Sequence, residues 1–580
     1  MRKTLDYKES RGSFTERHAL MAIVLLYCCL YGLALVTRVS DIAFMAVDER
    51  SIMGSIHGLF SGPFYNMNEQ YHSKVYGWTY FSINFAVMSP LKFFQVESEV
   101  IYNSLARGII FFIGLALSLV FHAVSKRVFS RALALFLTFI FITNPVSAHF
   151  FTIIHPESTG MLFYLLGLLY LFKFFSADSG KLHLYLIGLA WFCFSALSKQ
   201  PFAITSFFTI VLFPVFLWWS GGRSILSYLR QRQTWGLLAA SIIAALAILF
   251  VVHPYSILDF SSFLKGQLRP LSHSAGRSLE VAAPLWYDQL KENPLATLNF
   301  MVLFTLPFSK KLRLPALFVY SVLISSALAL LFMFMQKLFI QVTYLYPLYP
   351  LFLWNIAFAL QSALKPLFCR GKTSGRVLIV LLVFLFAPLL VLNTLQSAYT
   401  SYARFQLEGH TTKSQSYSYI NALSSDKKFF YMPSVAIPKD LKPNSCHVWR
   451  NCHTIQGIRE FSPDYIFVAW GYKYFNPNPL NSYMQEESYE LIDEFRGGKS
   501  IGDECGEPEY KVKRRLEPQK KDRVDRRKEA LRSEYSFYKN ASPYSLSLRV
   551  GDCLSRFIEV SSMGSTEKFI GLDIEVWKKL

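Results

Sequence analysis

Residues Ala19–Val36 read ALMAIVLLYCCLYGLALV and carry no charged side chain. An apolar run of about 18–22 residues is long enough to cross a bilayer as an α-helix. Comparable runs recur along the chain, and their number and few charges argue against a soluble protein with apolar core helices. The other clear runs are Gly108–Val124, Met161–Phe175, Leu182–Leu197, Leu237–Val252, Leu314–Met335 and Val377–Leu395.

The composition and the N-terminal residues agree with a membrane protein. Of the 580 residues, 52% are hydrophobic and 16% aromatic, which is rare in soluble domains. A charged leader, Met1–His18, precedes the first apolar run. Because that run exceeds the roughly 7–15 apolar residues of a signal peptide, and no small-x-small cleavage site follows it, we expect it to be retained as the first helix.

The positive charges predict the topology. The net charge is +20, and Lys and Arg gather in separate segments between the apolar runs. Since loops rich in Lys and Arg face the cytoplasm, they predict a cytoplasmic N-terminus, about eleven transmembrane helices and an extracytoplasmic C-terminal region. This pattern is typical of a multi-pass protein of a bacterial inner (plasma) membrane. The basic segments are Met1–Arg17, Lys126–Arg131, Gly221–Gln233, Ser309–Arg313 and Lys365–Arg376.

The chain divides into three predicted blocks. Residues 1–398 form a transmembrane domain with large extracytoplasmic loops at 40–104 and 254–294. Residues 399–509 form a soluble extracytoplasmic domain, and residues 510–580 form a basic linker and C-terminal extension. The expected fold class is therefore mainly α, a polytopic helical membrane protein with a smaller C-terminal α/β or α+β domain.

Local patterns support a mixed class for the soluble block. Lys427–Ile437 and Asp464–Tyr472 are typical of buried strands, whereas Ser482–Phe495 is predicted to be helical. The basic run Lys511–Arg532 is either a solvated linker or a patch that meets anionic lipid headgroups. If this region is extracytoplasmic, nucleic acid is excluded as its partner.

The cysteines fit an extracytoplasmic C-terminal region. Cys446, Cys452, Cys505 and Cys553 lie there. In an oxidising compartment they allow two disulfides with three pairings. A zinc site is the weaker interpretation because the chain has no C-x-x-C pair.

The loop at 40–104 carries the first candidate catalytic residues. It contains VDERS, in which Asp48 and Glu49 are adjacent, and later His72 and Lys74 among many aromatic residues. Taken alone, the acidic pair is explained by two solvated groups that end a helix. Beside a sugar and a lipid phosphate, a carboxylate can instead take the proton of an acceptor hydroxyl. Phosphate leaves without a general acid, so one base suffices for an inverting displacement.

Two shorter polar turns lie between apolar runs. In TIIHPESTGM, Glu157 follows His155 and Pro156, and it either stabilises the N-terminus of the next helix or faces the same cavity as Asp48. In SALSKQPFAI, Lys199 either extends to the headgroups or binds the phosphate of a donor.

The loop at 254–294 supplies the remaining candidates. Arg269 and Arg277 are suited to bidentate binding of phosphate. Tyr255 and His273 are expected to line the cavity with His72, Lys74, His155 and Glu157. The loop follows His253 and also contains Asp259 and Lys265, and a wet loop is the simpler explanation for most of these side chains taken one by one.

The order of these features resembles a known family. After the acidic pair come KVYGWTYF, SKRVFS, NPVSAHFFTIIHPE, LSKQP, HPYSILDFSSFL and YLYPLYPLF. Together they resemble the GT-C glycosyltransferases of the protein O-mannosyltransferase and lipid A aminoarabinose transferase type, over roughly Ala19–Leu360. The motifs are weak one by one, and the resemblance rests on their order.

The resemblance implies a GT-C fold and assigns roles to matching residues. Asp48 falls on the catalytic Asp of the family, Glu157 on its second acidic residue and Lys199 on the Lys of a Thr-Lys-Gly-Pro-like turn. Gln200 stands where that turn usually has Gly. HSKVYGWTYF lacks the adjacent prolines of the lipid A enzymes, which argues against lipid A specificity. The C-terminal block has no counterpart.

These observations predict a glycosyltransferase. It would transfer one sugar from a polyprenyl-phosphate donor to a lipid, glycan or protein acceptor on the non-cytoplasmic face, with Asp48 as general base. Glu49 would orient the acceptor or bind a divalent metal, which is the one cofactor that the sequence leaves open. One alternative is a flippase or sugar transporter, whose sequence would be expected to show an internal repeat and charged residues near the middle of the membrane. The second alternative is a glycan polymerase or ligase.

Overall fold

The fold is taken from a computed structural model of the chain. It describes residues 14–32, 47–61, 77–96, 98–176, 182–220 and 232–265, then 412–423, 426–432, 441–447, 454–469, 486–495 and 574–579, with some single positions between them. The chain divides into two compact units. The first contains residues 1–36 and 51–401, and the second contains residues 37–50 and 402–580.

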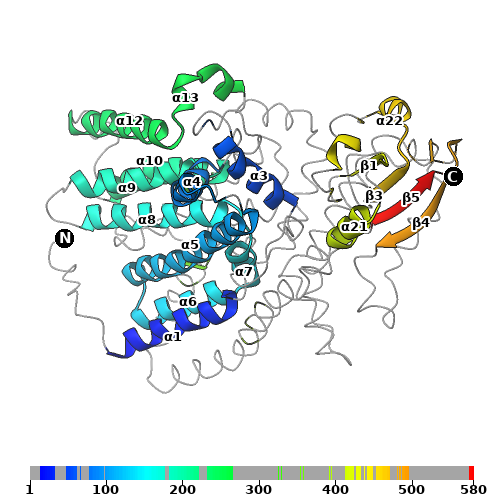
Figure 1. Ribbon diagram of the computed structural model, residues 1–580. Coiled ribbons are helices and arrows are strands. Elements are labelled where there is room, and N and C mark those ends of the chain that lie inside the picture. Colours follow the sequence, from blue (N-terminus) through cyan, green and yellow to red (C-terminus); the bar gives the residue numbers. More distant parts are fainter. Residues whose placement is uncertain are drawn as a thin grey trace, which may run out of the picture. The chain divides into compact units, whose positions relative to one another are not determined.

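The described part of the first unit is helical (Figure 1). α8 packs against α9 and α5, and α9 packs in turn against α10 and α12. The helices are α1 (Phe14–Tyr31), α4 (Trp78–Phe93), α5 (Glu99–Val128), α6 (Arg131–Thr143), α7 (Pro145–Thr152), α8 (Glu157–Ser176), α9 (Leu182–Ala196), α10 (Gln200–Ser220), α12 (Arg232–Val252) and α13 (Tyr255–Leu258). α3 (Val47–Ser61) begins in the second unit and ends in the first.

Small residues let α8 and α9 approach closely. A Cβ placed on Gly188 of α9 would lie 3.3 Å from the carbonyl oxygen of Gly167 and from the amide nitrogen of Leu171, both on α8. A Cβ on Gly167 would in turn lie 2.9 Å from the ring of Phe192. Helices in apolar surroundings use such small residues to bring their backbones together. The α8–α9 pair is therefore a fixed frame for the residues at its ends.

One ion cluster fastens α1 to the corner between α5 and α6. Glu16 is buried in the first turn of α1, and it accepts a hydrogen bond of 2.5 Å from Lys126 at the end of α5. Arg131, the first residue of α6, lies 3.3 Å from the other carboxylate oxygen. Lys126 and Arg127 also lie in the last turn of α5, where positive charge is favourable.

The expected fold of about eleven transmembrane helices is wrong on the described residues. Among them, only the helix Val100–Val128 is long and apolar enough to cross a bilayer. The apolar helices Arg131–Thr143, His183–Ala196, Pro201–Val211 and Ala239–Val252 are shorter. Because about 20 residues of apolar helix are needed to cross a hydrocarbon core of about 30 Å, these described stretches of 10–17 residues fall short. The predicted runs Leu314–Met335 and Val377–Leu395 lie almost wholly outside the described residues.

The described part of the second unit is built on a five-stranded sheet of order β2-β1-β3-β5-β4. β1 (Phe429–Tyr431) pairs in parallel with β2 (Ser445–His447) and β3 (Tyr465–Ala469). β5 (Ile574–Lys579) lies between β3 and β4 (Tyr489–Phe495), antiparallel to both (Figure 1). The sheet is therefore completed by residues from the end of the chain.

Two of the predicted strands are confirmed and one predicted helix is wrong. β1 and β3 lie within the predicted strands Lys427–Ile437 and Asp464–Tyr472. The second half of the predicted helix Ser482–Phe495 is instead the strand β4. Pairing with β5 decides this conformation, and β5 lies about eighty residues further along the chain.

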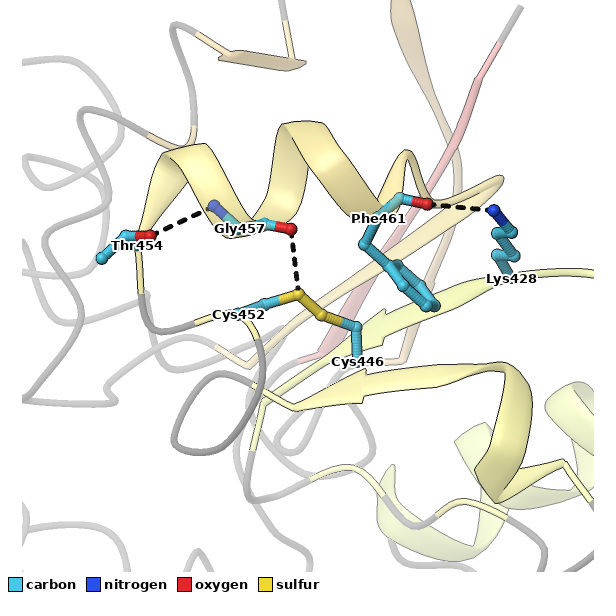
Figure 2. The surroundings of a disulfide bond; sticks show 6 residues. All are labelled: Lys428, Cys446, Cys452, Thr454, Gly457 and Phe461. Carbon is cyan, nitrogen blue, oxygen red and sulfur yellow. Dashed lines mark hydrogen bonds between the residues drawn. A yellow bond between two sulfur atoms is a disulfide. The ribbon is translucent and has the colours of Figure 1, made fainter.

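A disulfide and a short helix secure the other edge of the sheet. Cys446 in β2 is bonded to Cys452, and their Cα atoms are 5.8 Å apart. The Sγ atom of Cys452 lies 3.5 Å from the carbonyl oxygen of Gly457 in α22 (Ile455–Phe461), as Figure 2 shows. Thr454 caps this helix by accepting a hydrogen bond of 3.1 Å from the amide of Gly457. Cys505 and Cys553 lie outside the described residues.

Candidate functional site

Four turns of the first unit meet at the ends of α4, α8, α10 and α12. The amide of Gly77, just before α4, donates a 2.7 Å hydrogen bond to the carbonyl oxygen of Ser198, just before α10. The hydroxyl of Thr79 donates to the carbonyl oxygen of Phe194 in α9 at 2.7 Å. The hydroxyl of Ser82 donates to the carbonyl oxygen of Val252, the last residue of α12, at 3.1 Å. Segments far apart in the sequence are thus joined around the α9–α10 turn.

Gly77 is required for this junction by its backbone conformation. Its φ is +85°, in the left-handed region that glycine adopts without a steric penalty. A Cβ there would also lie 2.9 Å from the ring of Phe81. Any other residue would strain the turn that places Trp78 and the bond to Ser198.

A buried ion pair lies at the centre of the site. The side chain of Glu157 has no exposed surface, and it contacts both Lys199 and His155. Lys199 donates a hydrogen bond to Oε1 of Glu157, and Nδ1 of His155 faces Oε2. The side chains of Lys199 and His155 are each only 8% exposed. Charges this deep are rare without a partner, and such groups are candidates for function.

Two helix N-termini point their positive ends toward this cluster. Glu157 is the first residue of α8. Lys199 directly precedes α10, and its carbonyl oxygen accepts hydrogen bonds from the amides of Phe202 and Ala203 at 3.0 and 3.2 Å. Each N-terminus carries partial positive charge. With Lys199, these ends supply more positive potential than the single carboxylate of Glu157 cancels, so the site favours an additional anion.

Three aromatic rings lie together where α4 begins and α12 ends. Trp78 and His253 meet edge to face with ring centroids 4.9 Å apart. Phe263 contacts both, at 5.3 Å from Trp78 and 5.5 Å from His253. Trp78 follows Gly77, so these rings adjoin the turn that holds Lys199. Polar groups beside aromatic faces are typical of sites for small organic ligands.

The described part of the chain brings together some of the predicted residues. His155, Glu157 and Lys199 form one cluster, and Tyr255 begins α13 as a half-buried residue. The pairing of Lys199 with Glu157 was not predicted, because a separation of 42 residues leaves no local signal. The burial of His253 was also missed, although its place at the end of an apolar run was a clue.

The other predicted residues are not joined to this cluster. Asp48 and Glu49 lie in the first turn of α3, in the part of the chain that belongs to the second unit. The side chain of Glu49 is buried, while that of Asp48 is outside the described side chains. His72, Lys74, Arg269, His273 and Arg277 all lie outside the described residues.

The described residues contain no group of three His, Cys, Asp or Glu side chains that could hold a metal ion. At Glu157, the cation beside the carboxylate is Lys199. The chemistry available there is therefore ion pairing and hydrogen bonding by Lys199, Glu157 and His155. No protein-family model matches the chain, and no curated protein sequence matches it.

Proposed function

We propose that this protein is a membrane-bound glycosyltransferase that moves one sugar from a polyprenyl-phosphate donor to a lipid, glycan or protein acceptor. The observation that carries the proposal is the buried Glu157–Lys199–His155 cluster, whose Lys199 lies in the turn that is hydrogen-bonded to Gly77, the residue before Trp78. A donor of this class joins an anion to a sugar, and the site offers positive potential next to aromatic and polar groups.

The proposed reaction is an in-line displacement at the anomeric carbon. The acceptor oxygen forms a bond to that carbon while the bond from the carbon to the phosphate oxygen breaks, and the configuration inverts. The acceptor proton passes to a general base, the role that the sequence predicts for Asp48, and polyprenyl phosphate leaves with the electron pair of the broken bond. A base in this role typically accelerates a reaction about 10²–10⁴-fold.

Lys199 is the residue of the cluster that would bind the leaving phosphate. An ammonium group carries three N–H donors, and Glu157 accepts one of them. The helix N-termini of α8 and α10 would add to the stabilisation of negative charge as it develops on the phosphate. Glu157 and His155 would hold the ammonium group in position.

The expected location is a bacterial inner (plasma) membrane, with the second unit outside the cytoplasm. The disulfide between Cys446 and Cys452 supports this location, because disulfides persist in oxidising compartments. The helix Val100–Val128 would cross the bilayer.

The test is sugar transfer in vesicles that contain the full chain and synthetic polyprenyl phosphates carrying labelled glucose, galactose or mannose, with an extract of membrane lipids as acceptor. We expect product with the wild-type protein, a loss of about 10²-fold or more with Asp48→Asn, and a comparable loss with Lys199→Gln. Lys173→Gln is the matched control, since Lys173 lies at the opposite end of α8 over the ring of Tyr170. Full activity of the Asp48→Asn variant would exclude Asp48 as the base.

A transporter or flippase is the second candidate, and the buried ion pair favours it as well. Paired ionisable groups such as Glu157 and Lys199 also mark ion pathways and proton relays in transporters. The same vesicles separate the two functions. Movement of the labelled lipid across the bilayer without a new glycosidic bond would replace transfer by transport.

A further inference from the structure

His253 stands out among the described polar groups of the first unit. Its side chain is fully buried, and neither Nδ1 nor Nε2 has a hydrogen-bond partner among the described residues. The hydroxyl of Ser256, which is 2% exposed, also has none within the same residues. The amide of Ser256 donates a 2.9 Å hydrogen bond to the carbonyl oxygen of His253, so both side chains come from one turn.

Buried polar groups nearly always have partners, because leaving them unsatisfied costs free energy. Here one imidazole and one hydroxyl, three residues apart, both lack them within the described structure. Together they offer donors and acceptors that a polar ligand can satisfy. The turn therefore has the character of a binding site.

The surroundings of His253 restrict the class of ligand. Trp78 and Phe263 meet its ring edge to face, with interplanar angles of 81° and 73°. A sugar ring presents C–H groups on its faces and hydroxyls around its edge, which matches aromatic rings combined with a few polar groups.

The charge state of His253 also favours a sugar as the ligand. Burial lowers the pKa of His253 to about 4, so the imidazole is neutral near pH 7. A neutral imidazole has one donor and one acceptor nitrogen, and two sugar hydroxyls can accept from the first and donate to the second. It offers no charge for an anion, whereas Lys199 does.

We propose that His253 and Ser256, bordered by Trp78 and Phe263, form the subsite that binds the hydroxyls of the donor sugar. This rests on the proposed function, since the sugar is placed here by its link to a phosphate at Lys199. Gly77 and Trp78 connect the two places, through the hydrogen bond to Ser198 and the ring contact with His253. Because His253 is fully buried, groups that cover it must move aside when the sugar binds.

The test measures binding rather than turnover. Full-length protein in nanodiscs is titrated with labelled polyprenyl phosphate, and separately with polyprenyl phosphate carrying glucose, galactose or mannose. We expect the wild-type protein to bind at least one sugar-bearing carrier about tenfold more tightly than the bare carrier, as hydrogen-bonded recognition of hydroxyls requires. His253→Leu should remove this preference and leave the affinity for the bare carrier unchanged.

Further variants separate binding from folding. His253→Gln keeps one donor and one acceptor and should retain part of the preference, and Ser256→Ala should reduce it. Lys199→Gln should weaken the binding of both kinds of carrier. A preference that survives His253→Leu, or a wild-type protein that binds every carrier equally, would overturn the subsite. A sugar preference without sugar transfer in vesicles would leave the subsite in place and reject the glycosyltransferase.

Discussion

The start of α8 at Glu157 can be predicted from the sequence, whereas the pairing of Glu157 with Lys199 cannot. Pro156 and Glu157 were expected at the start of a helix, and α8 begins at Glu157. Helix-start signals act over one turn, so they are readable from the sequence. The partner across the turn, Lys199, is set by the packing of α8 against α9 and α10, and no local pattern records it.

The buried pair predicts a clear result from single and double substitutions. Glu157→Leu removes the carboxylate that faces the buried charge of Lys199, and Lys199→Met removes the ammonium group that faces Glu157 and leaves it His155, so each should lower the free energy of unfolding by about 3–5 kcal/mol. The double variant replaces both charges by apolar groups and should be more stable than either single variant. The measurement is the midpoint of unfolding of the full chain in detergent, followed by intrinsic fluorescence.

An exposed ion pair of the same chain provides the control. Arg459 and Glu486 lie 2.6 Å apart with side chains 49% and 58% exposed. Removing that pair should change the free energy of unfolding by less than about 1 kcal/mol, because solvent screens it. If the two substitutions at Glu157 and Lys199 proved additive, the pair would not be coupled.

At the scale of elements, local sequence patterns predict the buried strands β1 and β3 but not the edge strand β4. β1 and β3 are apolar runs buried in the sheet, and their sequences were sufficient to identify them. β4 is at the edge of the sheet, and Leu491 and Ile492 are both about 40% exposed, so its pattern does not mark a buried strand. Its conformation depends on β5, which no local window includes.

The ion pair that attaches β5 to the sheet predicts that the stability of β5 depends on pH. Lys579 in β5 lies 2.8 Å from the carboxylate of Glu487, just before β4. The hydrogen bond from Lys579 lowers the pKa of Glu487 below its ordinary value of 4.5. Glu487 therefore contributes stability that is complete above its ordinary pKa and is lost as the pH falls through the lowered value. The same bond raises the pKa of Lys579, whose contribution is complete below 10.5 and is lost at higher pH.

Hydrogen exchange measured by mass spectrometry can test this at the strand itself. In the full chain, protection of residues 574–579, corrected for the intrinsic exchange rate, should be constant between about pH 6 and pH 9 and should fall below about pH 4. Lys579→Met should lower protection at pH 7 and remove the decrease that comes from Glu487. An unchanged pH profile in that variant would mean that Glu487 does not hold β5.

At the scale of the whole molecule, the sequence predicted more membrane crossings than the described residues contain. Hydropathy measures the composition of a run, but it does not fix where a helix ends. The run Leu182–Leu197 became α9, whose 15 residues extend only about 22 Å. The run Gly108–Val124 became part of α5, whose 30 residues extend about 45 Å. Helix length, set by turns and tertiary contacts, separates the two.

The decisive prediction at this scale is that α5 crosses a membrane, and in which direction. Its last turn holds Lys126 and Arg127, and Arg131 follows, whereas the turn before its start holds the exposed residue Phe94. Because Lys and Arg favour the cytoplasmic side, we expect the end near Phe94 to face the outside. In a chain without its native cysteines, a cysteine at position 94 should react with a membrane-impermeant maleimide added to intact cells. A cysteine at position 131 should react only after the cells are opened, and labelling of both from the outside would mean that α5 does not cross the membrane.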